Sequence, residues 1–263
     1  AAVISKDMDA IKKEYGRKRR TAIENAEEAV YEEKKMEEME VCFLMDRFGY
    51  MKLIDKNAYE RNKEAVHNEN KYVFNCMNTD KICIFTDTGK MHTIKAVDIP
   101  LGRFRDKGTP VDNLSNYDSS QERMLYVAPV GQLRSDRLLF VTKTSMCKLV
   151  EGAEFDVAKR TIASTKLADE DELIFIGSAS EMEQIVLQSH GGCFLRFLTQ
   201  EVSTMKKTAL GVRGMKLADD DYLEHAYLLA GHQEYTISYH DKEYALNKVR
   251  LAKRDTKGIK PRI

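Results

Sequence analysis

Short apolar runs separated by turn residues make up most of the chain from Val41 onward. The runs are rich in β-branched and aromatic residues, and none continues into a clear amphipathic helix, which is typical of strands. The beginning of the chain differs, because its apolar residues recur at helical spacing before a glycine, at Ile4, Met8, Ile11 and Tyr15. The pattern therefore predicts an all-β protein with a short N-terminal helix.

A pair of apolar runs joined by a turn occurs five times. The copies read CFLMDRFGYMKLI, CIFTDTGKMHTI, LLFVTKTSMCKLV, IVLQSHGGCFLRF and YTISYHDKEYALN, with turns at Gly49, Gly89, Ser145, Gly192 and Lys242. Successive turns are 40, 56, 47 and 50 residues apart. A period of roughly fifty residues in a strand-rich chain indicates small sheets arranged around an axis, each packed on its neighbours. We therefore expect a propeller-like fold with five blades.

Each unit has a second half, which runs from a basic loop through a short strand and an acidic turn to a last apolar strand. The acidic turn and the last strand are clearest in LADEDELIFIG and LADDDYLEHAYLL, at residues 167–177 and 217–229. The two halves together give about four strands per blade. The fifth unit ends at Ile263 after its third strand, so we expect a strand near residues 29–33 to cover the open edge and close the ring.

The chain carries 42 basic and 42 acidic side chains, but the two signs are segregated. Residues 24–40 hold eight acidic and two basic side chains, whereas residues 241–263 hold eight basic and three acidic ones. We interpret residues 1–21 as a terminal helix and a junction, residues 22–40 as an acidic linker, and residues 41–263 as the β repeat.

Cations also recur at one position of the repeat, the loop that follows the hairpin. The loop of the second unit, GRFRDKG, is the densest, and its glycine lies nineteen residues beyond the turn glycine, as in the fourth unit. Cations at one position of successive blades form a belt that suits a polyanion, and the loop glycines allow close approach of a phosphate backbone. Since nothing resembles a recognition helix or a zinc finger, the belt is not expected to read sequence.

Several classes of protein are disfavoured by the sequence. No apolar run is long enough to span a membrane, and the first residues lack a signal-peptide pattern. The five cysteines are far apart and form no CxxC pair, so we expect free thiols in a reducing compartment and no metal site. The six histidines are scattered and no phosphate-binding P-loop occurs, so no catalytic residue is proposed.

Three separated motifs resemble one bacterial family. They are FTDTGKMHTIKAVDIPLGRFRDKGTPVDNL at residues 85–114, ALGVRGMKLADDD at residues 209–221 and KEYGRKRRT at residues 13–21. On these motifs the chain is identified as a member of the C-terminal domain family of the bacterial type IIA topoisomerase A subunit, which includes the A subunits of DNA gyrase and topoisomerase IV.

The resemblance implies a β-pinwheel, a propeller variant in which neighbouring blades exchange strands and a basic outer edge binds and bends double-stranded DNA. It also implies that cleavage chemistry, ATP and magnesium belong to the rest of the enzyme, so that this fragment has no catalytic activity of its own. The parent protein is expected to form an A2B2 complex with an ATPase partner, in the bacterial cytoplasm at the nucleoid, away from membranes. The fragment itself is expected to be a monomer.

With DNA as the expected ligand, the belt supplies the candidate contacts. The strongest candidates are Arg103, Arg105, Lys107, Lys206, Lys207, Arg213, Arg254 and Lys257, followed by Arg61, Lys159 and Arg160.

The chain departs from the gyrase pattern after its first hairpin. Gyrases carry a box close to Gln-Arg-Arg-Gly-Gly-Lys-Gly there, which full DNA wrapping requires. The matching region here reads YERNKEAVHNEN, residues 59–70, which has no glycine pair and includes three glutamates. The resemblance therefore favours a role like that of topoisomerase IV, in relaxing and decatenating DNA, with a divergent gyrase as the alternative.

A different class of function also fits a bladed repeat. A propeller can serve as a scaffold for protein–protein interaction, with rim charges that only maintain solubility. The salt dependence of duplex DNA binding distinguishes the two, because phosphate contacts make affinity fall steeply with salt.

Overall fold

The computed structural model describes residues 2–18, 20–21, 37–231 and 233–261. The chain divides into two compact units, Ala1–Glu37 and Glu38–Ile263. In the first unit, helix α1 (Ala2–Tyr15) is the predicted N-terminal helix. Within the described residues, no helix has the length and apolar character to cross a membrane. The strand expected near residues 29–33 lies outside the described residues.

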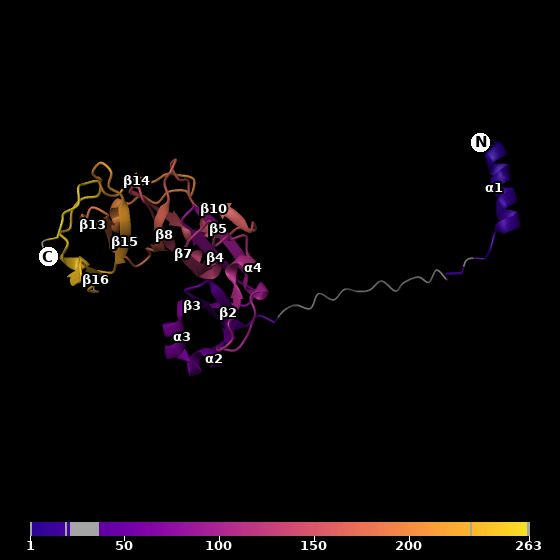
Figure 1. Cartoon of the computed structure of the whole chain (residues 1–263), viewed down its shortest axis with the longest axis horizontal. Helices are drawn as coiled ribbons and strands as arrows, with labels where there is room; N and C mark the ends of the chain where they lie inside the picture. Colours follow the sequence, from indigo (N-terminus) through magenta and orange to yellow (C-terminus); the bar gives the residue numbers. More distant parts are fainter. Residues whose placement is uncertain (1, 19, 22–36, 232, 262–263) are drawn as a thin grey trace. The chain divides into compact units, whose positions relative to one another are not determined.

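The second unit is a series of small antiparallel sheets that follow one another along the chain (Figure 1). Each predicted hairpin is present in its own sheet. The strands are β1 (Glu40–Asp46), β2 (Tyr50–Asp55), β3 (Asn70–Met77), β4 (Lys81–Thr86), β5 (Lys90–Lys95), β6 (Thr109–Pro110), β7 (Met124–Pro129), β8 (Arg137–Thr142), β9 (Met146–Glu151), β10 (Thr161–Ala163), β11 (Leu173–Ser178), β12 (Gln184–Ser189), β13 (Phe194–Leu198), β14 (Val212–Arg213), β15 (Leu223–Leu229), β16 (Thr236–Tyr239) and β17 (Lys242–Ala245).

Neighbouring sheets exchange strands. The sheet orders are β3-β1-β2-β6, β10-β5-β4-β7 and β11-β8-β9-β14, so the short strand that follows each hairpin pairs with the preceding sheet. The fourth sheet, β13-β12-β15, receives Ile259 through a bridge to Phe194 in the same way. This exchange is the pinwheel arrangement that the family resemblance implied.

The exchanged strands lie at the outer edge of each sheet. Strands β3, β7, β11 and β15 contact one another from sheet to sheet and therefore form the inner edge. The exchanged strands stand at the opposite edge, which faces away from this inner line. The basic loops lead directly into these outer strands.

Apolar residues between successive sheets form the core. Separate clusters join the first sheet to the second, the second to the third, the third to the fourth and the fourth to the fifth. Between the second and third sheets, the rings of Phe85 and Phe155 meet edge to face with centroids 4.9 Å apart, and Phe140 packs on both. All five cysteines are free thiols, as predicted.

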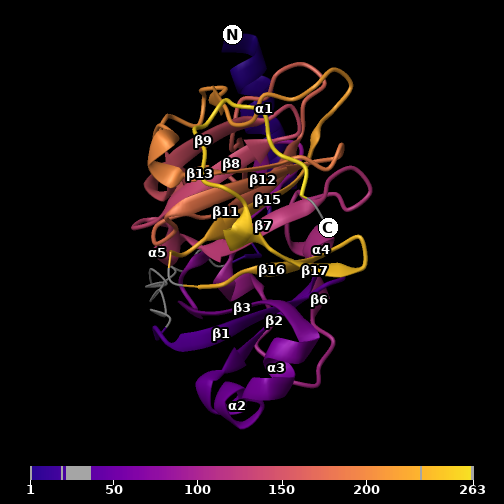
Figure 2. The same cartoon turned by 90° about the vertical axis from the view of Figure 1, so that its left-hand side faces the viewer.

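Residues 56–69 differ from the sequence prediction, which placed no helix after the N-terminal one. They form α2 (Lys56–Arg61) and α3 (Lys63–Glu69), beside β2 and β3 (Figure 2). Asp55 caps α2 by accepting a hydrogen bond from Ala58 N, and Val66 is buried against the first sheet. In the later units, the segment that follows the hairpin contains the exchanged strand. In the first unit, α2 and α3 take the place of that strand. Two further one-turn helices are α4 (Val111–Leu114) and α5 (Val130–Leu133).

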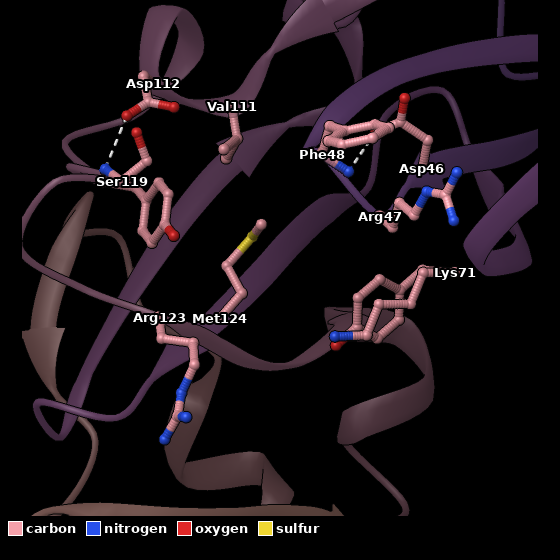
Figure 3. Close-up of a pocket in the computed structure, with 11 residues that line it drawn as sticks. Asp46, Arg47, Phe48, Lys71, Val111, Asp112, Ser119, Arg123 and Met124 are labelled. Carbon is pink, nitrogen blue, oxygen red and sulfur yellow. Dashed lines mark hydrogen bonds between the residues drawn. The ribbon is translucent and has the colours of Figure 1, made fainter.

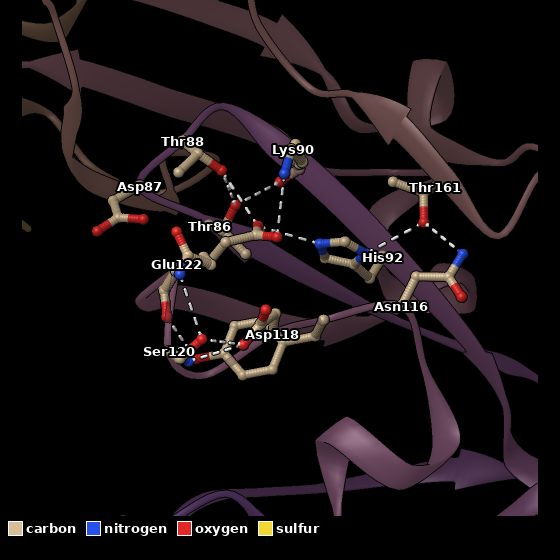
Figure 4. Close-up of polar contacts among 12 residues, drawn as sticks. Thr86, Asp87, Thr88, Lys90, His92, Asn116, Asp118, Ser120, Glu122 and Thr161 are labelled. Carbon is tan, nitrogen blue, oxygen red and sulfur yellow. Dashed lines mark hydrogen bonds and ion pairs between the residues drawn. The ribbon is translucent and has the colours of Figure 1, made fainter.

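A buried polar network joins the inner and outer parts of the second sheet (Figure 4). His92 Nε2 lies 3.1 Å from Glu122 Oε2, and its Nδ1 lies 3.1 Å from Thr161 Oγ1 on the exchanged strand β10. Lys90 Nζ donates to Glu122 Oε1 at 3.1 Å. Burial raises the pKa of Glu122, but hydrogen bonds from His92, Thr86 and Lys90 outweigh it and leave that pKa at about 2.

Because of this low pKa, the stability of the fold depends on pH. A carboxyl whose pKa is lower in the folded than in the unfolded protein stabilises the fold above its unfolded pKa, and this contribution is lost as the pH falls toward 2. Between pH 5 and 2.5 we expect the free energy of unfolding of the wild type to fall by about 1–3 kcal/mol more than that of Glu122→Gln. Urea titrations at each pH measure this, with the exposed Glu151→Gln as control. Parallel pH curves for wild type and Glu122→Gln would contradict the assignment.

Candidate nucleic-acid interface

Apart from Arg61 and Arg213, the predicted cations lie in loops at the outer edges of consecutive sheets. Residues 102–108 lead into β6 on the first sheet, residues 156–160 into β10 on the second, and residues 205–211 into β14 on the third. Residues 252–258 lead to Ile259 on the fourth sheet. We call these four segments the outer loops.

The outer loops follow a common backbone path. Gly102 N, Met205 N and Ala252 N donate to the carbonyl oxygens of Leu53, Leu149 and Arg196, each on the sheet that the loop joins. This hydrogen bond is shared by the loops of the first, third and fourth sheets, and it places each of them along the outer edge of its sheet.

Two lysines hold outer loops from inside, and sequence reasoning missed both. Lys148 on β9 is almost fully buried, and its Nζ donates to Lys207 O at 2.7 Å and Ala209 O at 2.6 Å. Lys52 on β2 takes the same position in the first sheet and donates to Phe104 O and Asp106 O. The sequence does contain a signal for this role, because each lysine stands three residues after its hairpin turn, at Gly49 and Ser145.

Burial affects both of these ammonium groups. It lowers the pKa of Lys148 to about 8, although the carboxylate of Glu154 raises it. Burial also lowers the pKa of Lys52, which Asp106 in turn raises. Because each ammonium binds two loop carbonyls, these carbonyls point inward, and the charged form of Lys148 holds its loop up to about pH 8.

The loop glycines are required within the protein. Gly108 has φ +81° and Gly211 has φ +107°, a region that residues with a Cβ rarely adopt. A Cβ on Gly108 would lie 2.5 Å from Met51 O, and one on Gly211 would lie 2.7 Å from Cys147 O. The close approach here is between the loop and the strand beside it.

The loop of the first sheet presents its cations to solvent. Arg103, Arg105 and Lys107 are exposed, and within the described residues none of them forms an ion pair. Lys107 Nζ lies 4.4 Å from the centroid of the Tyr50 ring, which holds it on the first hairpin. This loop therefore offers three unneutralised cations in five residues.

Other predicted cations are engaged within the fold. Lys207 Nζ donates to Glu154 O at 2.9 Å, and Arg254 Nε donates to Glu201 O at 3.0 Å. Both side chains are only half exposed. These two side chains therefore stabilise the loops from within the fold. Their contact with DNA stays a prediction.

Two other exposed candidates, Lys206 in an outer loop and Arg213 on β14, are paired with carboxylates. Arg213 binds Asp255 through Nε and Nη2, and its hydrogen bond lowers the pKa of Asp255. Lys206 Nζ lies 3.3 Å from Glu154 Oε1. Among the described residues, the predicted cations that are exposed and outside any ion pair are Arg61, Arg103, Arg105, Lys107, Lys159, Arg160 and Lys257.

Arg61 stands apart from the others, because it lies on α2 and not in an outer loop. Its Nε donates to Asn57 O at 3.1 Å, within the same helix. Together the structure brings most of the candidates to one edge of the sheets and separates Arg61 from them.

Three segments of the chain match one family model. The model described as "DNA gyrase C-terminal domain, beta-propeller" matches residues 80–119, 136–180 and 183–230, which is half of the chain. The chain belongs to this family.

The relatives of this gyrase C-terminal domain family member are longer proteins. The chain is 29% identical over 224 residues to the DNA gyrase A subunit of Clostridium acetobutylicum, covering 81% of this chain and 27% of that protein. It is 29% identical over 231 residues to the DNA gyrase A subunit of Salmonella typhimurium, covering 83% and 26%. The chain thus spans about a quarter of the length of these relatives.

Solved structures support the pinwheel fold of this family member. The C-terminal domain of DNA topoisomerase IV matches with a TM-score of 0.73 at 22% identity, covering 85% of this chain and 73% of that one. The DNA gyrase A C-terminal domain matches with a TM-score of 0.56 at 18% identity, covering 84% and 76%.

Proposed function

We propose that this domain binds double-stranded DNA without sequence specificity along its outer edge and bends it. The observation that carries this proposal is the series of outer loops, which present unneutralised cations on the first, second and fourth sheets. A curved line of phosphate contacts favours a curved duplex, because the bent path lets more loops reach the backbone. Smooth bending costs on the order of several kcal/mol, which several phosphate contacts can offset.

The test is the salt dependence of binding to a duplex of mixed sequence. If the six predicted cations of the outer loops that are exposed and in no ion pair each take one phosphate, the slope of log affinity against log salt is about −5. Between 50 and 200 mM salt the affinity then falls by roughly a thousandfold. Fluorescence anisotropy with a labelled duplex measures this directly. A flat salt response favours the interaction-scaffold alternative and refutes DNA binding by this edge.

The first sheet differs in its contribution to the path of the DNA. Helices α2 and α3 occupy the position of the gyrase box, and they carry Glu60, Glu64 and Glu69 beside Arg61. Carboxylates near a phosphate backbone are repelled by it. We infer that DNA is bent at the outer loops without continuing around α2 and α3, as suits relaxation and decatenation better than full wrapping.

The parent protein is proposed to be an ATP-dependent type IIA topoisomerase that forms an A2B2 complex with an ATPase partner. ATP, magnesium and the cleavage chemistry belong to other parts of that enzyme in this proposal, and this domain supplies only DNA binding. The proposed location is the bacterial cytoplasm, at the nucleoid.

A further inference from the structure

The tip of the first hairpin presents an aromatic ring to solvent. Phe48 is 73% exposed, and the guanidinium carbon of Arg47 lies 5.1 Å from the centroid of its ring. Asp46 Oδ1 accepts hydrogen bonds from Phe48 N at 2.8 Å and Tyr50 N at 3.0 Å. The turn is therefore held by its own aspartate, and the side chains of Arg47 and Phe48 are left for contact with a ligand.

The tips of the next three hairpins are bound to their own sheets. Thr88 Oγ1 donates to Glu122, and Thr144 donates through N and Oγ1 to Asp171. Gly191 N donates to Asp221 in the same way. The tips of the second and third hairpins carry no aromatic ring, and His190 at the tip of the fourth is stacked on Tyr222 with ring centroids 4.7 Å apart. The Arg47–Phe48 pair is therefore a feature of the first tip that the repeat does not require.

A pocket of about 210 Å³ lies directly beside this tip (Figure 3). Lys71 and Arg123 line it together with Arg47, and apolar atoms of Val111 and Met124 line its interior. Its volume is below the roughly 300 Å³ at which pockets for drug-sized molecules begin. The pocket therefore suits one small group, with a larger planar group resting on the exposed ring of Phe48, which also lines the pocket.

Three cations and two carboxylates line the pocket. Asp112 Oδ1 is occupied by Ser119 N at 2.8 Å, and Asp46 by the turn. Arg123 is 64% exposed, with Asp87 Oδ2 at 3.6 Å from its Nε, and Lys71 Nζ lies 5.2 Å from the centroid of the Tyr72 ring. Three cations beside an exposed aromatic ring, with the two lining carboxylates held by backbone N–H groups, match a phosphate group joined to a planar base.

We propose that this tip binds an unpaired nucleotide of a DNA strand, with its base stacked on Phe48 and its phosphate among Arg47, Lys71 and Arg123. A base in an intact duplex has both faces covered by its neighbours, whereas a base at a bulge or mismatch leaves the stack at low cost. Stacking on an aromatic side chain is tolerant of sequence, because each base has a π face.

The position of the tip fits the proposed duplex path, on which this inference rests. Tyr50, two residues beyond Phe48, contacts Lys107 of the outer loop and pairs with Pro110 of the exchanged strand. A duplex on the outer loop of the first sheet therefore passes close to the tip. The site is a place where bent DNA with a local defect gains a contact that intact DNA lacks.

The experiment compares two labelled duplexes of equal length, one fully paired and one with a single bulged 2-aminopurine. At 150 mM salt we expect the wild type to bind the bulged duplex about tenfold more tightly, with a decrease in 2-aminopurine fluorescence on stacking. Phe48→Ala should bind both duplexes equally and leave the fluorescence unchanged. Phe48→Trp should retain the preference, because it keeps an aromatic face.

The control variant is Val97→Ala, which also truncates an exposed apolar side chain. Val97 lies two residues after the end of β5, at the end of that strand away from its hairpin turn. This variant should retain the tenfold preference. Equal affinity of the wild type for both duplexes, or a preserved preference in Phe48→Ala, would overturn the inference while leaving salt-dependent duplex binding intact. Absence of binding to either duplex would overturn the proposed function and this inference together.

Discussion

Replacement of Arg103, Arg105 and Lys107 by alanine is expected to lower affinity for duplex DNA about a hundredfold at 150 mM salt. Each lost phosphate contact removes about 0.9 from the slope of log affinity against log salt, which corresponds to roughly fivefold in affinity at this salt concentration. The three changes together reduce the slope by about three. The loss should be the same for unrelated sequences, because phosphate contacts carry no sequence information. Anisotropy titrations at five salt concentrations measure both quantities.

The matched control removes the same charge from cations outside the outer loops. Lys95, Arg137 and Lys242 are exposed residues at strand ends, and their replacement by alanine should change the affinity by less than threefold. An unchanged slope in the loop variant, or an equal loss in both variants, refutes the placement of DNA on the outer loops. A loss confined to particular sequences would refute binding through phosphates alone.

The second large effect is expected on stability, in Gly108→Ala and in Gly211→Ala. Each substitution places a Cβ at positive φ and within 2.7 Å of a carbonyl oxygen of the neighbouring strand, Met51 O or Cys147 O. The strained backbone and the displaced strand cost about 2–3 kcal/mol per substitution. For a unit of this size that corresponds to a melting temperature lower by roughly 4–12 °C, measured by thermal unfolding.

Gly131→Ala is the control for these two variants. Its Cβ would meet only the end of the flexible Asp80 side chain, at 2.9 Å, and its φ is not in the positive region. We expect a change in melting temperature of less than 3 °C. Equal melting temperatures for Gly108→Ala, Gly131→Ala and the wild type would show that the loop does not need its glycine.

Sequence alone predicted the hairpins because each one consists of two short apolar runs joined by a tight turn, and the turn residues Gly49, Gly89, Ser145 and Gly192 have positive φ. Even Ser145, which replaces a glycine, has φ +73°, and its Oγ accepts a hydrogen bond from Met215 N at 2.7 Å. The exchanged strands could not be predicted from periodicity. Strands such as β6 and β14 have only two residues, and their partners are decided by packing between sheets.

Helices α2 and α3 were missed for a related reason. They have six and seven residues, which is too short for a helical period to stand out, and of these only Val66 is buried. Their stability comes from the cap at Asp55 and from contact with the first sheet.

For the candidate site, sequence located the cations but not their partners. Lys206 and Lys207 are adjacent in sequence, yet one is exposed and the other binds a backbone carbonyl. Which of two neighbours turns inward depends on the loop path, and that path is set by Lys148 from a strand about sixty residues away. The repeated lysine three residues after the turn marks the donor of such a hydrogen bond, but the sequence does not show which loop carbonyl accepts it.

The exchange of strands also governs how such a chain can be shortened. Removal of residues 246–263 takes Ile259 from its bridge with Phe194 and opens the edge of the fourth sheet, which lies wholly earlier in the sequence. A cut between repeats in the sequence is therefore never a cut between structural units. Fragments and fusions of this protein need boundaries placed after the exchanged strand, one loop later than the repeat itself suggests.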